Sequence, residues 1–175
     1  PVDPEETYDL RETPLTAGIR EFVAVMRGCD NYCTYCIVPF VRGREKSRPT
    51  ASVLREVGGL TALGTTDITL LGQNVNSYRD GDTDFPELLR RVGAVPGLER
   101  LRFATSHPKD LSPELIETIA STDAVCEHIH LPVQSGSDRV LASMGRSYDR
   151  ERYLELVRAM RGRVPNVAFT TDSSW

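Results

Sequence analysis

Three of the four cysteines in this 175-residue chain, Cys29, Cys33 and Cys36, lie within eight residues of one another. Their spacing, C-x3-C-x2-C, follows an apolar run that is typical of a strand and ends in Arg27-Gly28. A loop this short can wrap its thiolates around one metal centre. Three thiolates leave a tetrahedral zinc site incomplete, whereas a cubane iron–sulfur cluster can take three and keep one iron open. The odd number of cysteines therefore favours a cluster.

Two other interpretations of these cysteines stay open. A disulfide framework is disfavoured, because the count is odd and a chain of this length does not need the covalent staples of a small secreted domain. A zinc site of three cysteines and one histidine is the more serious alternative. Its fourth ligand would be His107, His128 or His130. The fourth cysteine, Cys126, is expected to be a small buried apolar residue.

The composition is that of a globular protein, with 39% hydrophobic and 26% charged residues, and the length suits one domain. No apolar run approaches the ~20 residues of a membrane span, and the first residues do not resemble a signal peptide. We therefore expect a cytoplasmic protein without membrane association, in a compartment where thiols stay reduced.

The net charge of −4 does not indicate a general nucleic-acid binder. However, four basic residues follow the cysteines within seven positions, and beside a metal centre they are candidates for contacting RNA or another substrate. They are Arg42, Arg44, Lys46 and Arg48. The alternative is a solvated charged loop, which Glu45 would partly balance.

The rest of the chain alternates apolar, strand-like runs with segments of helical period, which predicts an α/β fold with a parallel sheet and right-handed crossovers. The expected strands are 22–27, 67–71, 100–105, 127–133 and 167–171. The helical segments each have one apolar face. Ser112-Pro113 is a typical helix start, with a capping serine and a proline in the first turn.

Two histidines, His128 and His130, alternate with Ile129 and Leu131 in the fourth expected strand. Because strand side chains alternate between faces, the apolar pair should lie against helices and the histidines on the opposite face. Polar residues on that face near several strand ends favour a barrel with an internal ligand site, whose active groups lie at the carboxyl ends of the strands. For each histidine alone, a hydrogen-bonded core role is the simpler interpretation.

The cysteine motif, with Tyr35 just before its last cysteine, resembles the signature of the radical S-adenosylmethionine (SAM) enzymes. Five flanking segments resemble the methylthiotransferase subgroup of that family: 27–31, 37–44, 72–78, 105–108 and 131–138. Among its branches, Gly72-Gln73-Asn74 and Thr105-Ser106-His107-Pro108 are most similar to the one that modifies a prenylated adenosine beside the tRNA anticodon. Other branches act on a threonylcarbamoyl-modified adenosine or on a ribosomal protein.

This resemblance implies a transferase with a [4Fe–4S] cluster on Cys29, Cys33 and Cys36, whose open iron binds SAM. Electron transfer to the sulfonium of SAM would then yield a 5′-deoxyadenosyl radical. Tyr35 would lie close to the adenine of the cofactor. The other cofactor-binding candidates are Gln73, Asn74, Ser106 and Gln134. Where many relatives have Gly-Gly-Glu, this chain has Gly72-Gln73-Asn74, which weakens the assignment of Gln73 and Asn74.

The family's fold implies an incomplete parallel (β/α) barrel, which we expect here over residues 21–175 and ending after about five strands, with 1–20 as an interdomain linker. The resemblance further implies tRNA as partner, an electron donor such as flavodoxin, a monomeric state, and a second [4Fe–4S] cluster in a domain outside this chain. Without that second cluster we expect no methylthio product. A non-catalytic, metal-stabilised RNA-binding domain is the alternative from a different functional class.

Overall fold

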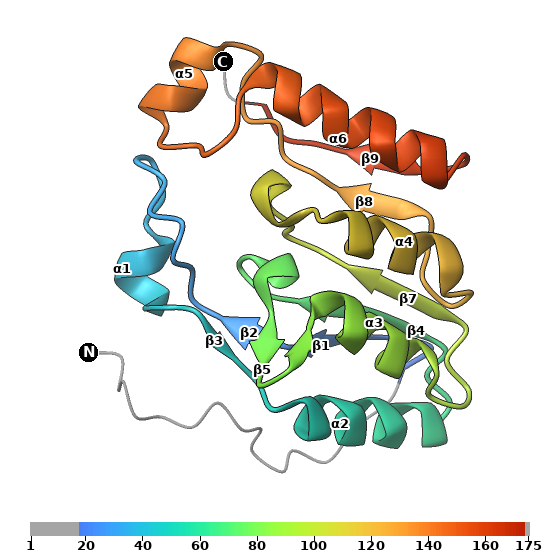
Figure 1. The fold of residues 1–175 in the computed structure, drawn as a ribbon. Helices are drawn as coiled ribbons and strands as arrows, with labels where there is room; N and C mark the ends of the chain where they lie inside the picture. Colours follow the sequence, from blue (N-terminus) through green and yellow to red (C-terminus); the bar gives the residue numbers. More distant parts are fainter. Residues whose placement is uncertain (1–17, 174–175) are drawn as a thin grey trace.

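A computed structural model describes residues 18–173. Its five parallel strands form an arc with helices packed along one side (Figure 1). In spatial order the strands are β1 (Arg20–Ala24), β4 (Asp67–Leu71), β7 (Arg100–Phe103), β8 (His128–His130) and β9 (Ala168–Thr170). The first three form one sheet, β8 pairs with β9, and a bridge between Leu101 and Val125 joins the two parts. The predicted incomplete (β/α) barrel is confirmed.

Four long helices cover the outer face of this arc (Figure 1). They are α2 (Thr50–Ala62), α3 (Phe85–Gly93), α4 (Pro113–Ser121) and α6 (Arg150–Arg163). The predicted cap of α4 is present, because the Ser112 hydroxyl accepts a hydrogen bond of 3.1 Å from the Leu115 amide. Asp84 and Asp149 cap α3 and α6 in the same way. The side-chain cap therefore fixes the residue at which each of these helices begins.

The two faces of the arc differ in character. Side chains that point toward the helices are fully buried and apolar, and they form the core. They include Val23, Ile68, Leu70, Leu101 and Ile129. The inner face is open and partly polar: Phe22, Thr69 and Arg102 lie in one register row across β1, β4 and β7, and Phe22 is 62% exposed. His128 and His130 lie on this inner face, as predicted, on either side of the buried Ile129.

The strand bounds differ from the sequence-based ones where the chain leaves the sheet. The expected strand 22–27 is interrupted after Ala24, because β2 (Met26–Arg27) pairs antiparallel with β3 (Lys46–Ser47). The strand expected at 100–105 ends at Phe103, and Thr105 adopts a left-handed conformation with φ of 66°. The strands expected at 127–133 and 167–171 shorten to β8 and β9, while 67–71 matches β4.

Several short elements at the carboxyl ends of the strands lack a sequence prediction. They are α1 (Val38–Arg42), α5 (Asp138–Ser143), the 3-10 turns η1 (Val75–Ser77) and η2 (Pro108–Asp110), and the antiparallel pair β5 (Arg79–Asp80) and β6 (Thr83–Asp84). They are too short to show a hydrophobic period. Residues 1–17 of the expected linker lie outside the described part of the chain. Among the described residues, no helix combines the length and apolar character needed to cross a membrane.

Candidate metal centre

The three clustered cysteines lie on the cysteine loop (residues 28–37), at the carboxyl ends of the strands and next to α1 and α5 (Figure 1). The loop begins at Gly28, which has a φ of +73° and donates a hydrogen bond of 2.6 Å from its amide to the Gln73 side chain. A Cβ atom at Gly28 would lie 2.0 Å from the Arg44 carbonyl oxygen. Only glycine therefore allows the chain to enter the loop at this point.

The cysteine side chains are mostly covered. Cys29 and Cys33 are 8% and 9% exposed, and Cys36 is partly exposed. Backbone hydrogen bonds hold the loop closed, from the Cys29 amide to the Gly43 carbonyl at 3.2 Å and from the Cys36 amide to the Cys33 carbonyl at 2.9 Å. Burial raises the pKa of the Cys29 thiol, and Glu45 and the other two thiols add to this effect. The Cys29 thiol thus lies within electrostatic reach of the other two thiols.

The cysteine loop is tied to the segment after α5. Thr34 donates from its amide to the Met144 carbonyl at 3.0 Å and from its hydroxyl to the Ser143 carbonyl at 2.9 Å. Arg146 donates from Nη1 to the sulfur of Cys33 at 3.3 Å. A guanidinium N–H directed at a sulfur stabilises the thiolate form that binds metal. These contacts connect the loop to a segment more than 100 residues away.

Sequence reasoning did not identify Arg146. Its Nε donates to the Tyr148 hydroxyl at 3.1 Å, and its guanidinium carbon lies 5.3 Å from the centre of the Tyr148 ring. Tyr148 in turn donates to the carbonyls of Pro132 and Val133 at 3.1 Å, so the arginine is fixed relative to the end of β8. Arg146 lies between α5 and α6, where no periodic pattern marks it, and only the contact with Cys33 reveals its role.

The donor set fits a cubane iron–sulfur cluster. Such a cluster needs one thiolate on each of three irons, and it keeps its fourth iron for another ligand. The cysteine loop supplies three thiols, a largely buried setting and an N–H donor to one sulfur. The alternative of a zinc ion held by three cysteines and a histidine is not supported. Within residues 18–173, no three His, Cys, Asp or Glu side chains, the three cysteines included, come together closely enough to hold one metal ion, whereas the thiolates of a cubane cluster each bind a separate iron.

The three histidines of that alternative have other surroundings. His107 is 6% exposed, and its Nδ1 accepts a hydrogen bond of 3.1 Å from the Lys109 amide. Burial, together with the charges of Arg146 and Lys109, lowers the pKa of His107 to about 3. His128 and His130 contact the Thr170 hydroxyl at 3.2 and 3.1 Å. These contacts agree with the simpler interpretation of each histidine as a hydrogen-bonded residue of the barrel.

Three of the predicted cofactor-binding side chains form hydrogen bonds within the protein. Gln73 accepts from the Gly28 amide, and Ser106 donates from its hydroxyl to the His130 carbonyl. Asn74 is 1% exposed and donates to Asp110 at 2.8 Å. The Oδ1 of Asn74 is buried without a hydrogen-bond partner, so contact between Asn74 and a cofactor stays a prediction. Gln73 and Ser106 link neighbouring strand ends, and their contact with a cofactor also stays a prediction.

The other two predicted cofactor residues remain accessible. Tyr35 is 51% exposed on the cysteine loop, and partial burial raises the pKa of its hydroxyl. Gln134 follows β8 with a φ of 65°, and its amide donates to the Asp172 carbonyl at 2.9 Å. Within the described residues, the Gln134 side chain makes no hydrogen bond of its own. Tyr35 and Gln134 therefore stay candidates for contacting a cofactor.

The predicted basic cluster divides into surface and core residues. Arg42 and Arg44 are exposed, and Arg44 pairs with Asp30 at 3.0 Å. Arg48 is 1% exposed, and its Nη1 donates to Glu56 at 2.6 Å and to the Ala24 carbonyl at 2.7 Å. Its predicted contact with RNA or substrate is wrong, because its guanidinium serves as a buried link between β1 and α2. Lys46 belongs to β3 and is partly exposed.

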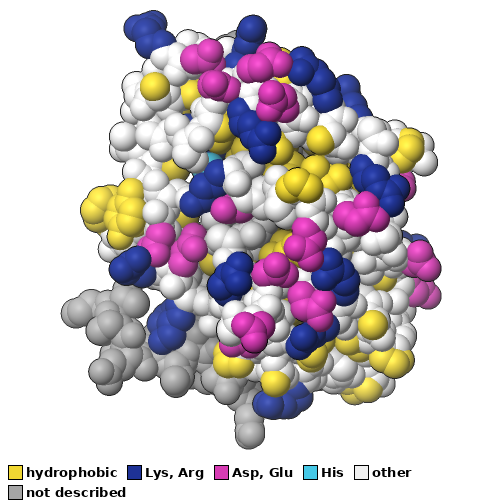
Figure 2. All heavy atoms as spheres, in the orientation of Figure 1, with side chains coloured by type: hydrophobic (Ala, Val, Ile, Leu, Met, Phe, Trp, Pro, Cys, Tyr) yellow, Lys and Arg dark blue, Asp and Glu magenta, His cyan; other side chains and the backbone are white. Residues whose placement is uncertain are grey.

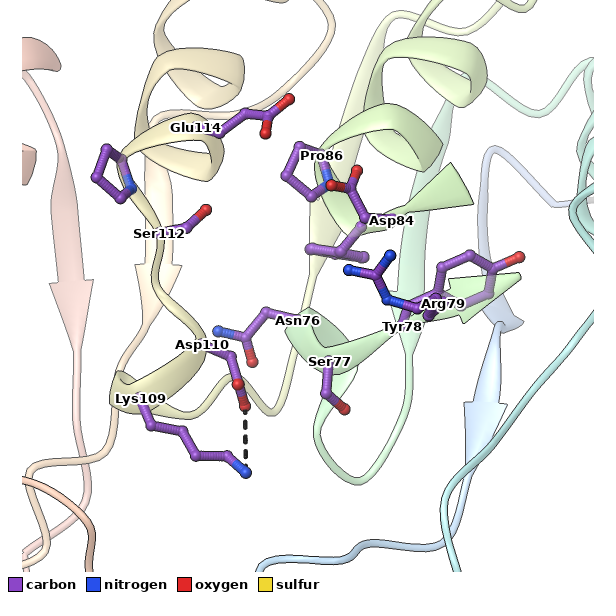
Figure 3. A pocket seen from close by; sticks show the side chains of 12 residues that line it. Asn76, Ser77, Tyr78, Arg79, Asp84, Pro86, Lys109, Asp110, Ser112 and Glu114 are labelled. Carbon is purple, nitrogen blue, oxygen red and sulfur yellow. Dashed lines mark ion pairs between the residues drawn. The ribbon is translucent and has the colours of Figure 1, made fainter. Parts of the chain in front are cut away.

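A hollow of about 720 Å³ lies between the starts of α3 and α4, on the side of the strands that carries the helices (Figure 3). Its lining contains both signs of charge, including Arg79 and Glu114, and an ion pair between Lys109 and Asp110 at 3.9 Å. Both helix starts are already capped by side chains. None of the predicted site residues lines this hollow, so it is separate from the candidate metal centre.

A comparison with known proteins shows to which family this chain belongs. A profile of the radical SAM superfamily matches residues 23–173, which is most of the chain and includes all three clustered cysteines. The chain belongs to the radical SAM superfamily. This assignment agrees with the partial barrel and with the position of the cysteine loop at its strand ends.

Similar curated proteins carry one recurring name, tRNA-2-methylthio-N(6)-dimethylallyladenosine synthase. The protein of that name from Clostridium perfringens is 55% identical over 89% of this radical SAM chain, which covers 36% of the relative. The one from Geobacter sulfurreducens is 54% identical over 98% of this chain, covering 39% of the relative. This chain therefore spans well under half the length of these relatives.

Solved structures support the fold independently. The radical SAM methyltransferase TsrM from Kitasatospora setae superposes with a TM-score of 0.69 over 87% of this chain and 30% of that one, at 22% identity. The cobalamin-dependent radical enzyme OxsB superposes with the same TM-score over 87% of this chain and 23% of that one, at 13% identity. At these identities the likeness shows the radical SAM barrel alone.

Proposed function

We propose that this chain is the radical SAM core of a tRNA methylthiotransferase that acts on a prenylated adenosine beside the anticodon. The observation that carries the proposal is the enclosed set of three cysteines at the strand ends, with Arg146 bonded to the sulfur of Cys33. The substrate class is supported by relatives at 53 to 56% identity that carry that name. This chain covers 40% of the length of those relatives, so the complete reaction is proposed only for a protein that also contains their remaining part.

The roles of the residues follow from their positions. The thiolates of Cys29, Cys33 and Cys36 would hold three irons of a [4Fe–4S] cluster, and its fourth iron would bind SAM. When bound, the cluster supplies the electron that breaks a carbon–sulfur bond of SAM and yields a 5′-deoxyadenosyl radical. Arg146 donates a hydrogen bond to the Cys33 sulfur, while Tyr35 on the cysteine loop and Gln134 after β8 offer accessible side chains. The inner face of the arc is where a substrate base would lie.

Cofactor cleavage tests the catalytic part of this proposal. The chain would be reconstituted anaerobically with iron and sulfide, reduced, and incubated with SAM, and 5′-deoxyadenosine would be measured. We expect product from the wild-type chain and less than about 1% of it from Cys33→Ala, because a cluster with two thiolates is not held. Cys126→Ala is the matched control and should keep full cleavage, since Cys126 lies outside the loop. Equal cleavage by both variants would contradict the proposal.

A further inference from the structure

The surface around α1 is unusual for its exposed apolar side chains. Nine large hydrophobic residues are exposed in the described part of the chain, and five of them lie between residues 32 and 41. We call these five the α1 patch: Tyr32, Tyr35, Ile37, Phe40 and Val41. Helix α1 itself has no buried residue. Figure 2 shows hydrophobic side chains gathered at the edge where Figure 1 places α1. An exposed apolar cluster of this kind marks an interaction site.

The chemistry of the α1 patch favours RNA as its occupant. Phe40, at 75% exposure, and Tyr32, at 54%, offer aromatic rings to solvent. Arg42 lies in the last turn of α1, directly after the patch. Exposed rings next to a cation match unpaired nucleotides, whose bases stack on aromatic side chains while their phosphates contact basic ones. A paired duplex hides the base faces that such rings would contact.

The local charge agrees with a polyanionic occupant. Residues 27–48 contain five basic and two acidic side chains, a net charge of +3, in a chain whose net charge is −4. Arg48 is buried against Glu56 and Arg44 pairs with Asp30, which leaves Arg27, Arg42 and Lys46 against Glu45, a net charge of +2. Positive charge concentrated on one segment of an acidic protein attracts nucleic acid locally. A purely apolar protein partner would gain little from these residues.

The α1 patch also adjoins the metal centre. Helix α1 begins at Val38, two residues after Cys36, and lies at the same end of the strands as the cysteine loop (Figure 1). We infer that the α1 patch is a stacking surface for unpaired bases of the RNA substrate, with Phe40 as its central ring and Arg42 contacting phosphate. This inference rests on the proposed function, since it assigns a surface to the RNA loop that carries the reacting adenosine.

RNA binding tests the inference directly. Fluorescence anisotropy would compare the reconstituted chain with two labelled RNAs, a stem-loop with unpaired adenosines and a fully paired duplex of the same length. We expect tighter binding of the stem-loop. Phe40→Ala should weaken that binding about 5- to 100-fold, the effect of losing one base–aromatic stack, and Phe40→Trp should retain it. Arg42→Gln should reduce the slope of log K against log salt by about 0.7.

Leu63→Ala is the matched control, because Leu63 is 57% exposed and ends α2, away from the α1 patch. It should bind the stem-loop like the wild-type chain. The inference is overturned if Phe40→Ala binds like the wild-type chain, if Leu63→Ala loses as much affinity, if the duplex binds as well as the stem-loop, or if the chain binds neither RNA. Formation of 5′-deoxyadenosine without RNA is measured separately, so failure of the inference is distinct from failure of the proposed function.

Discussion

Arg146 donates a hydrogen bond of 3.3 Å to the sulfur of Cys33, although 113 residues separate them along the chain. The contact links the cysteine loop to the connection between α5 and α6. A hydrogen bond and a positive charge at a ligating sulfur stabilise the more negative, reduced state of an iron–sulfur cluster. The segment after β8 is therefore part of the candidate metal centre, together with the loop that carries the cysteines.

Replacing Arg146 should change the properties of the bound cluster. We expect Arg146→Gln to give a more negative reduction potential and about 10- to 100-fold weaker iron binding, because the sulfur loses a charged donor. Arg146→Lys should lower the reduction potential less than Arg146→Gln does. The measurement is a redox titration followed by electron paramagnetic resonance (EPR). Arg152→Gln, which removes an exposed ion pair with Glu155, is the control. An unchanged potential in Arg146→Gln would show that the bond to Cys33 has no electronic role.

Two glycines near the cysteine loop should respond differently to alanine. Gly28 and Gly43 have φ values of +73° and +74°, but a Cβ at Gly28 meets the Arg44 carbonyl and one at Gly43 meets nothing within 4 Å. Gly43 has a φ of 74° and a ψ of −165°, a region that only glycine adopts readily, so Gly43→Ala should cost backbone strain of about 1–3 kcal/mol. Gly28→Ala should cost more and reduce iron binding, because the loop must move. Urea unfolding and iron content measure both effects. Equal losses in the two variants would mean that the close approach at Gly28 is relieved at no cost.

Arg48 and Arg42 come from the same basic segment and should differ in their effect on stability. Arg48→Ala leaves Glu56, whose side chain is 13% exposed, without its partner. Breaking such a buried pair costs about 3–5 kcal/mol. Arg42→Ala removes an exposed side chain and should change the free energy of unfolding by no more than about 0.5 kcal/mol. Chemical denaturation distinguishes them, and a small effect of Arg48→Ala would contradict its role as a buried link.

His107 should make the protein less stable in acid. Its pKa falls from the ordinary 6.5 to about 3 on folding, chiefly through burial. Between these values the unfolded chain binds more protons, so the contribution of His107 is complete above pH 6.5 and declines as the pH falls toward 3. In this pH range the free energy of unfolding changes by up to about 1.4 kcal/mol per pH unit. His107→Asn keeps an acceptor for the Lys109 amide and should show a shallower decline in urea titrations. If the free energy of unfolding falls equally steeply with pH in the wild-type chain and in His107→Asn, His107 is not the source of the acid sensitivity.

Much of the fold was predictable because it rests on local patterns. The apolar run 67–71 matches β4 residue for residue, and Ser112 caps α4 as its sequence context indicates. Alternation also placed His128 and His130 on the inner face. These features depend on neighbours one to four positions away, which a single sequence displays directly.

The features that sequence reasoning missed depend on distant contacts. Nothing near Arg48 shows that Glu56 and the Ala24 carbonyl enclose it, and its basic neighbours indicate a surface residue instead. Arg146 meets Cys33 only because the barrel brings the segment after β8 next to the cysteine loop. Asn74 likewise looks available in the sequence, but it is buried against Asp110. Tertiary packing determines the surroundings of all three side chains.

The central claim is that the three cysteines hold a cluster with one iron open to SAM. The most direct measurement is EPR of the anaerobically reconstituted, reduced chain with and without SAM, together with iron counting. We expect about four irons per chain, as a [4Fe–4S] cluster requires, and a spectrum that shifts when SAM is added. A single bound zinc, or a cluster spectrum that SAM leaves unchanged, would show that the cysteine loop is structural and would contradict the enzymatic account.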